Sequence, residues 1–349
     1  MTHADTLTFG ELTAQFTRLT TEQQKNFYDF AKAIVVGNNS YLDQNLSTER
    51  KFSDGIKCLK CGSTNIKKHG IIGNGIRHQR YYCKDCHQTF TELHNSPLHG
   101  TKKSLEIWYM FIFRMLTGGY SLKRLSEELK INIKTAFYWR HKILYALRDY
   151  LMTDTVGGVV ETDETYFLQS FKGQKRGLPR PARKRGGKAT KRGTSNEQVC
   201  VMTSTDHKGK YLADLTCYGR ASHTSIERFF NNRIEANSII VTDEHKSYLR
   251  FAKEHNFELK QVKRGKHKAD EVYHNQNVNN FHSRLKRFMG GFNGVATKYL
   301  GNYVTWCKFV VIMKSMRFTD YCNELLAITE TTEMKTRVID FGQMTPAFI

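Results

Sequence analysis

An apolar stretch at residues 159–167 carries three acids, and it constrains the fold of the chain more than any other feature. Two glycines precede it, and valine, threonine, tyrosine and phenylalanine fill it, so the pattern predicts a strand that leaves a loop. Successive side chains of a strand point to opposite faces, so Glu161 and Asp163 share one face while Glu164 points to the other. Such acids belong either to the solvated face of an edge strand or to a metal site presented from a sheet. The segments that follow decide between these two interpretations.

The segments after residue 197 predict a mixed sheet with helices packed on it. We expect a hairpin of two strands at residues 198–205 and 210–218, followed by a helix that begins at residue 224. A strand at 238–243, a helix at 247–255 and a strand at 258–262 come next. The third of these strands ends on Asp243, 80 residues after Asp163. With one further helix after them, the order of elements is that of the ribonuclease H-like fold, whose mixed sheet presents acids from its central strands.

The last helix of this series has one apolar and one polar face. Its apolar residues recur at helical spacing and should pack on the sheet: Val278, Phe281, Leu285 and Phe288. The opposite stripe advances by four, three and four residues: Asn275, Asn279, His282 and Lys286. Asn279 and Lys286 lie two turns apart, so both face the same site. Two acids at strand ends with a polar helix beside them are what a Mg²⁺-dependent phosphoryl-transfer site requires.

Two CxxC pairs predict a structural zinc site nearer the start of the chain. Cys58 and Cys61 are followed, after 21 intervening residues, by Cys83 and Cys86. Four thiolates in two such pairs provide the tetrahedral set that a closed Zn²⁺ site needs, and the segments between them look like short strands of a zinc ribbon. A redox dithiol would need only one pair. The ribbon carries many lysines and arginines, which favours DNA as its partner, although ribbons also bind proteins.

Residues 105–147 predict three helices, of which the last two resemble a helix-turn-helix. The first ends at a pair of glycines, Ser121 caps the second, and the third begins near Ile133. We expect basic and aromatic side chains on the exposed side of the third helix: Lys134, Tyr138, Arg140, His141 and Lys142. In a helix-turn-helix, the later of the two helices enters the major groove of DNA, and the basic and aromatic side chains of this third helix are typical of that role. An ordinary three-helix packing unit fits the pattern nearly as well.

Charge indicates a polyanionic partner. The chain has 54 Lys and Arg against 33 Asp and Glu, a net charge of +21, which favours nucleic acid over the alternatives of a ribosomal or membrane-surface protein. Residues 172–192 hold ten basic residues and no acid, so we expect a flexible loop that clamps a phosphate backbone through Lys184 and Arg185, rather than a plain solvated linker. Residues 1–5 do not show the basic start and apolar core typical of a signal peptide, and no apolar run is long enough to span a membrane, so we expect a soluble protein.

Three stretches carry a resemblance to bacterial insertion-sequence transposases of the DDE superfamily: residues 161–166, 241–243 and 279–287. With the double CxxC ribbon and the helix-turn-helix before them, they are similar to the zinc-ribbon group, whose signature runs Asp, Asp, Asn or Glu, and then Lys. The resemblance covers roughly residues 55–317. It leaves out the first 50 residues and the end of the chain.

The resemblance implies a role for four residues. Asp163 and Asp243 are expected to be the metal-binding acids, Asn279 stands where the superfamily usually has Glu, and Lys286 is expected to engage DNA near the cut, with Arg287 beside it. The amide oxygen of Asn279 can coordinate Mg²⁺ but brings no charge, so we expect Glu161 to support the metal.

The resemblance also implies an activity and its partners. We expect a DNA transposase that binds the terminal inverted repeats of its element and catalyses strand cleavage and strand transfer. One structural Zn²⁺ and two catalytic Mg²⁺ or Mn²⁺ are implied, together with double-stranded DNA, a homodimer or higher assembly on it, no membrane, and a bacterial cytoplasm with nucleoid association. The alternatives are a non-catalytic DNA-binding regulator derived from a transposase and a ribonuclease H-like nuclease without strand joining.

The domain prediction follows from these segments. We expect a multidomain α+β chain with a helical segment at 1–50, a zinc ribbon at 55–95, a helix-turn-helix domain at 100–150, a ribonuclease H-like catalytic domain at 155–317 and a C-terminal tail at 318–349.

Overall fold

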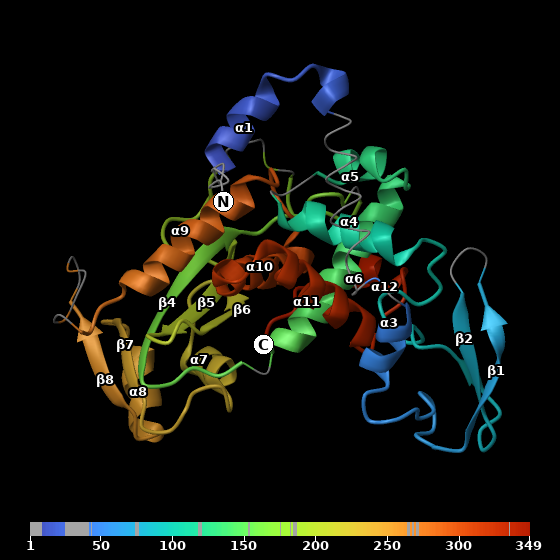
Figure 1. Cartoon of the computed structure of the whole chain (residues 1–349). Coiled ribbons are helices and arrows are strands. Elements are labelled where there is room, and N and C mark those ends of the chain that lie inside the picture. The colour runs from blue at the N-terminus through green and yellow to red at the C-terminus, as the bar shows by residue number, and fades with distance from the viewer. Residues whose placement is uncertain are drawn as a thin grey trace, which may run out of the picture. The chain divides into compact units, whose positions relative to one another are not determined.

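A computed structural model describes most of the chain (Figure 1). The described residues are 9–24, 42, 44–73, 77–117, 121–152, 154–174, 176–181, 183, 187–263, 266, 269, 272–334 and 336–349. The chain divides into two compact units, residues 1–92 with 102–107 and residues 93–101 with 108–349. Among the described helices, none combines the length and apolar character needed to span a bilayer. Within the expected helical segment at 1–50, residues 1–8, 25–41 and 43 fall outside the described residues.

The first unit contains a small antiparallel sheet. Its elements are α1 (Phe9–Thr17), α3 (Gln44–Lys51), β1 (Ile66–Ile72), β2 (His78–Cys83) and β3 (Thr89–Phe90). The strands lie in the order β1-β2-β3. Tyr81, Phe90, Cys58 and Cys83 form the buried centre of this unit, with Phe52 edge-on to both aromatic rings. The core is small, so it leaves the fold dependent on a further constraint.

The second unit is built on a five-stranded mixed sheet. Its strands are β4 (Val159–Leu168), β5 (Gln198–Asp206), β6 (Tyr211–Tyr218), β7 (Ile239–Asp243) and β8 (Glu258–Val262), in the order β6-β5-β4-β7-β8. The first three pair antiparallel, whereas β7 runs parallel to both β4 and β8. The acid-bearing strand β4 is therefore central, which makes the edge-strand interpretation wrong. The predicted mixed sheet is confirmed.

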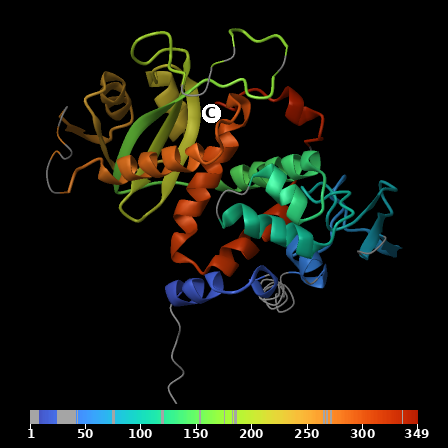
Figure 2. The same ribbon diagram turned by 90° about the horizontal axis from the view of Figure 1, so that it is seen from above.

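Helices cover the two faces of this sheet. They are α7 (His223–Phe230), α8 (Lys246–Glu254), α9 (Gln276–Gly290) and α10 (Thr297–Ile312), followed by a short 3-10 turn η2 (Met313–Ser315). Alternate residues of β5 enter different cores because strand side chains alternate between faces. Cys200 and Met202 pack with α7 and α8, whereas Val199 and Val201 pack with α9 and α10. Figures 1 and 2 show α9 lying along β4.

The three helices expected at residues 105–147 are present as α4 (Leu105–Leu116), α5 (Leu122–Glu128) and α6 (Ile133–Leu151). Ser121 caps α5 through the backbone N–H of Arg124, and Asn132 caps α6 through that of Lys134. The rings of Trp108 and Trp139 stack with their centroids 3.7 Å apart, which fixes α4 against α6.

The side of α6 that we expected to be exposed is partly buried. Arg140 and His141 are only 2% and 1% exposed, so the prediction that they lie on an outer face is wrong. The Arg140 guanidinium lies 5.4 Å from the centroid of the Trp306 ring, and burial lowers the pKa of both residues, that of His141 to about 3. The charge pattern of α6 was misleading because α10 packs over this side, which the local sequence does not reveal.

The expected C-terminal tail is folded. It contains α11 (Phe318–Thr331) and α12 (Asp340–Gln343). Leu325, Leu326 and Cys322 are fully buried, and the ring of Phe318 meets that of Phe113 edge-on. These apolar residues recur at helical spacing, so α11 completes the packing around α6 instead of extending into solvent.

Several basic side chains of the 172–192 segment are hydrogen-bonded to backbone carbonyls. Lys172 Nζ donates to the carbonyl of Gly294 at 2.8 Å, and Arg180 and Arg183 both donate to the carbonyl of Gln169. The described residues of the segment form no helix or strand. Lys184 and Arg185, the expected phosphate clamp, lie outside the described residues. The two arginines thus share the carbonyl of Gln169, the residue that follows β4, and the flexible loop stays a prediction.

A buried ion pair holds α7 to the sheet, and its loss should be costly. Arg233 Nη2 donates to Asp214 Oδ2 at 2.9 Å, and both side chains are less than a tenth exposed. Asp214→Asn leaves the guanidinium charge without its partner, so we expect unfolding to become easier by about 3 kcal/mol in a urea titration. As a matched control, Arg250→Gln breaks the exposed pair with Glu254 and should leave the urea midpoint close to that of wild type, because solvent screens this pair. Equal losses in the two variants would contradict this account.

Candidate active site and metal sites

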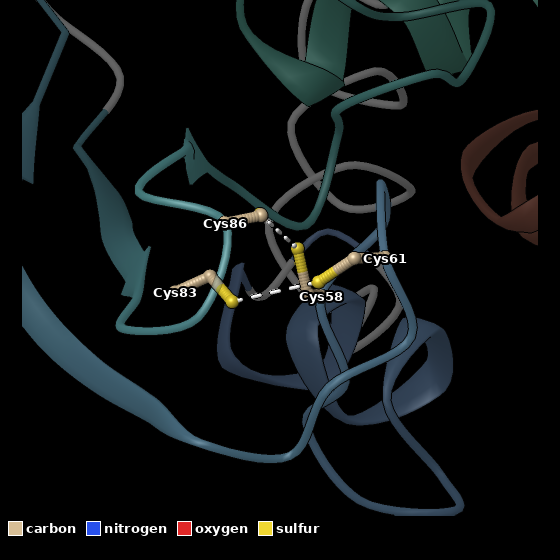
Figure 3. Close-up of side chains that lie close together, drawn as sticks. All are labelled: Cys58, Cys61, Cys83 and Cys86. Atoms are coloured by element: carbon tan, nitrogen blue, oxygen red, sulfur yellow. Dashed lines mark hydrogen bonds between the residues drawn. The ribbon is translucent and has the colours of Figure 1, made fainter.

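Four cysteine thiols gather at one point in the first unit (Figure 3). Their sulfur atoms all lie within 4.8 Å of one another, with Cys58 to Cys86 at 3.5 Å and Cys61 to Cys83 at 3.7 Å. A Zn–S bond of about 2.3 Å sets sulfur separations of about 3.8 Å in a tetrahedron. The four thiols predicted from the CxxC spacing are therefore compatible with a zinc site.

The two loops that carry these thiols are oriented by polar contacts. Backbone N–H groups of Cys86 and Asp85 point at the Cys83 sulfur and lower its pKa to about 6, which favours the thiolate that binds metal. The Asp85 carboxylate accepts hydrogen bonds from Ser63 Oγ at 2.5 Å and from Asn65 Nδ2 at 2.8 Å. These bonds tie the second CxxC loop to the residues that follow the first.

In the second unit, two carboxylates come side by side on adjacent strands. The parallel register of β4 and β7 pairs Glu161 with Val241, so two residues further along Asp163 lies beside Asp243. In-register residues of neighbouring strands project from the same face of a sheet. Burial raises the pKa of the Asp163 carboxyl to about 6, and the Asp243 charge adds to this rise, while the Glu164 backbone N–H and Lys286 oppose it. A divalent cation would relieve this repulsion, so the two acids fit a metal site.

Helix α9 brings its polar stripe to this pair of acids. His282 Nδ1 lies 3.8 Å from Asp163 Oδ2, and Lys286, one turn further on, is close enough to lower the pKa of Asp163. Asn279, one turn earlier, is exposed, and its side chain makes no hydrogen bond to any described residue. The structure therefore gathers Asp163, Asp243 and Lys286, and it places Asn279 on the same side of the helix by its spacing.

His282 is a site residue to which sequence reasoning gave no role, although it lay on the polar stripe. Its side chain is buried, and Nε2 has no hydrogen-bond partner among the described residues. Burial lowers its pKa to about 4, and the Lys286 charge contributes to the same effect, so the ring is neutral at physiological pH. A neutral imidazole beside Asp163 can accept or donate a hydrogen bond without competing for the charge at the acids.

The carboxylate of Glu161 contacts the start of α9. Its Oε2 accepts the backbone N–H groups of Asn277 at 2.9 Å and Val278 at 3.2 Å, and its Oε1 accepts from Asn277 Nδ2 at 2.6 Å. Helix α9 has no cap from Asn275, so Glu161 supplies the acceptor that a capping side chain normally provides. This contact joins segments that lie 116 residues apart, and support of a metal by Glu161 stays a prediction.

Glu164 points to the opposite face of β4, as the alternation predicts. Its carboxylate accepts a hydrogen bond from the Tyr248 hydroxyl of α8 at 2.7 Å. Burial raises its pKa to about 7, with the hydroxyl opposing the rise and the charges of Asp163 and Asp243 adding to it. Glu164 thus packs with α8, away from α9.

The candidate DNA-binding residues are placed unequally. Lys134, Lys286 and Arg287 are exposed. Tyr138 is half-buried, and Lys142 directs its ammonium to the Pro97 carbonyl at 3.1 Å. Arg140 is buried and is removed from this set. Lys286 also lines a cleft with Tyr166, Phe167 and Leu168 at the end of β4, so this end of the strand has a basic edge.

Comparisons with known proteins agree with the resemblance seen in the sequence. Residues 155–310 match the ISXO2-like transposase domain family. An uncharacterized protein in transposable element ISH50 of Halobacterium salinarum is 25% identical over 207 residues, which cover 58% of this chain and 67% of that protein.

Two solved structures are similar at 10% identity, the Mos1 strand transfer complex with a TM-score of 0.26 and a pre-cleavage Mos1 transpososome with a TM-score of 0.22. Each similarity covers 68% of this chain and 82% of the other chain. Because both TM-scores are low, the description of the fold rests on the strand order and strand directions of this chain alone. The match over residues 155–310 contains both paired acids and all of α9. Residues 155–310 thus match an ISXO2-like transposase domain, and the chain is similar to a protein of a transposable element.

Proposed function

We propose that this protein is a DNA transposase that binds the terminal inverted repeats of an insertion sequence, cuts DNA strands there and joins them to a target. The observation that carries the proposal is the in-register pair of Asp163 and Asp243, with Lys286 of α9 beside them. In this proposal the mixed sheet is a ribonuclease H-like catalytic domain, which its strand order supports. Residues 155–317 make up this domain.

The catalytic residues have distinct tasks in this proposal. Asp163 and Asp243 would hold Mg²⁺ or Mn²⁺, with the amide oxygen of Asn279 as a neutral third ligand. Bound metal would activate a water or a 3′-hydroxyl and neutralise charge at the phosphorus. Lys286 holds a DNA phosphate next to the acids, and Glu161 fixes the start of α9 so that its polar stripe stays aligned with β4.

DNA recognition is assigned to the segments before the catalytic domain. The Cys58, Cys61, Cys83 and Cys86 cluster would hold one structural Zn²⁺, and α5 with α6 would act as a helix-turn-helix through Lys134 and the partly exposed Tyr138. The net charge of +21 supports a long contact with phosphate. Two element ends must be processed together, so we propose a dimer or larger assembly on DNA.

A strand-transfer assay tests the proposal against its two alternatives. Purified protein is mixed with labelled element-end DNA, a supercoiled target and Mg²⁺ or Mn²⁺. We expect cut ends and joined products, both lost on chelation. Binding without any cut would favour a regulator derived from a transposase, and cutting without joining would favour a nuclease. The regulator is kept as an alternative because Asn279 stands where the superfamily usually has Glu and brings no charge to a metal.

Replacing Lys286 should weaken DNA binding without disturbing the fold. Lys286 is exposed on α9, so Lys286→Ala should leave the melting temperature unchanged while the dissociation constant for cleavable ends rises about tenfold, through loss of one charge-assisted phosphate contact. The slope of affinity against salt should fall by about one. The matched control is Lys253→Ala, an exposed lysine in the last turn of α8, which should change neither quantity. Unfolding of Lys286→Ala would contradict its placement.

A further inference from the structure

A second group of metal-binding side chains lies next to Asp163 and Asp243 but does not include them. Glu161 on β4, His207 in the turn after β5 and His274 just before α9 place their ligand atoms within 4.8 Å of one another. His274 Nδ1 lies 3.1 Å and His207 Nε2 lies 3.5 Å from the same oxygen, Oε1 of Glu161. Two imidazoles and one carboxylate, from three separate segments, therefore converge on one point.

The separations fit a transition-metal cation. Zinc binds imidazole nitrogen at about 2.0–2.1 Å and carboxylate oxygen at about 2.0–2.2 Å, which sets ligand atoms about 3.3 Å apart in a tetrahedron. The two Glu161 distances, 3.1 and 3.5 Å, lie on either side of this value. The rings of His207 and His274 are nearly parallel, at an angle of 24° with centroids 5.7 Å apart. Both rings can thus present a nitrogen to one cation.

Burial and hydrogen bonds from α9 fix the carboxylate of Glu161 in a position where it can bind such a cation. It is fully buried, and burial of a lone carboxylate is costly unless a positive partner is present. Within the described part of the chain, its ion-pair partners are these two histidines. Two backbone N–H groups of α9 fix Oε2, and Asn277 Nδ2 donates to Oε1, which keeps one lone pair for a metal. Outer hydrogen bonds of this kind orient the ligands of metal sites.

The site is also accessible. The His274 and His207 side chains are 21% and 37% exposed, so a cation can enter and a water can take the fourth position. A comparable group at His223, Glu227 and Glu254 differs because its acids are partly exposed and pair with neighbouring surface residues. Among the groups formed by the described residues, the Glu161 group combines a buried carboxylate with ligands from three segments.

We propose that Glu161, His207 and His274 bind a transition-metal cation of the Zn²⁺ type. The cation would join the turn between β5 and β6 to the first residues of α9, and so hold in place the helix that carries Asn279, His282 and Lys286. Imidazole with carboxylate favours Zn²⁺, Co²⁺ or Ni²⁺ over Mg²⁺, so this site is chemically distinct from the paired acids. The proposal does not depend on transposition activity.

Metal binding by the full chain tests the proposal without DNA. The Asp163→Asn variant serves as the background, so that the paired acids do not contribute. Metal-free protein is titrated with Zn²⁺ and with Co²⁺, and bound metal is measured after gel filtration. We expect two equivalents of either metal per chain. In the Co²⁺ titration, one equivalent should show the thiolate charge-transfer absorption of the Cys site, and the other should show only the d–d bands of a cation bound by nitrogen and oxygen.

Three variants locate the second equivalent. His207→Ala with His274→Ala should remove it and keep the thiolate signal, because both side chains are partly exposed and their loss leaves the core intact. Asn277→Ala should weaken its affinity about 10–100-fold through loss of the bond that orients Glu161. The control His255→Ala, an exposed histidine outside the group, should keep both equivalents. A single equivalent in the background protein, or a second one that survives the double histidine variant, overturns the proposal.

Discussion

Asp163→Asn is expected to abolish cutting of element-end DNA while the protein still binds that DNA and keeps its fold. The substitution removes one of the two paired carboxylates and with it the charge that holds the catalytic cation. A bound metal supplies several kcal/mol of transition-state stabilisation, so the cleavage rate should fall by about 1,000-fold or more. The fold should persist because Asn has the same shape and removes the repulsion from Asp243 that raises the pKa of Asp163. Single-turnover cleavage and a binding titration measure the two effects separately.

The matched control for this prediction is Glu258→Gln. It removes one negative charge from the same sheet, at an exposed position on β8 whose carboxylate contacts Lys260. Cleavage by this variant should stay within a factor of two of wild type. If Asp163→Asn cuts as fast as Glu258→Gln, the assignment of the paired acids is wrong, whatever the outcome for the Glu161 site.

Cys83→Ser is expected to release zinc and unfold the first unit between residues 44 and 92. Structural zinc contributes about 10–16 kcal/mol of apparent binding free energy in zinc-finger peptides. The buried centre of this unit consists of few side chains, so it cannot replace that contribution. We expect the thiolate-bound equivalent of metal to be lost, seen as disappearance of the thiolate charge-transfer absorption of the Co²⁺-loaded protein, with rapid proteolysis between β1 and β3. Binding to element ends should weaken as well, because the proposed recognition module is lost.

Cys307→Ala is the matched control for the zinc prediction. Cys307 is a buried thiol on α10, outside the cluster, and its loss should cost on the order of 1 kcal/mol through a small cavity. Zinc content and protease resistance of the first unit should remain those of wild type. A thiolate charge-transfer absorption kept at full intensity by Co²⁺-loaded Cys83→Ser would show that the four thiols are not the ligands.

The sequence predicted the elements whose signals are local. Alternation along residues 159–167 separated Asp163 from Glu164, and the contacts with α9 and α8 follow that alternation. The CxxC spacing predicted the thiol cluster because four sulfurs in two tight loops leave few other arrangements. Ser121 was identified as a cap because an N-terminal capping residue bonds to the backbone only a few residues away.

Only the tertiary structure decided the roles that depend on distant packing. Arg140 and His141 have the charge pattern of an exposed helix face, yet packing against α10 buries them. Residues 318–331 have apolar spacing without a local partner, and the surfaces of α4 and α6 provide that partner.

Glu161 shows most clearly which properties follow from the local sequence and which from the tertiary structure. Its place on the strand was determined by the sequence, because a strand alternates with a period of two. Its function was decided by the fold, because Asn277, Val278, His274 and His207 reach it from segments separated by long stretches of chain. The sequence by itself thus determined which residues could act, through short-range periodicity and spacing. The tertiary structure decided which of them meet, because burial and hydrogen-bond partners are set by contacts that no local pattern records.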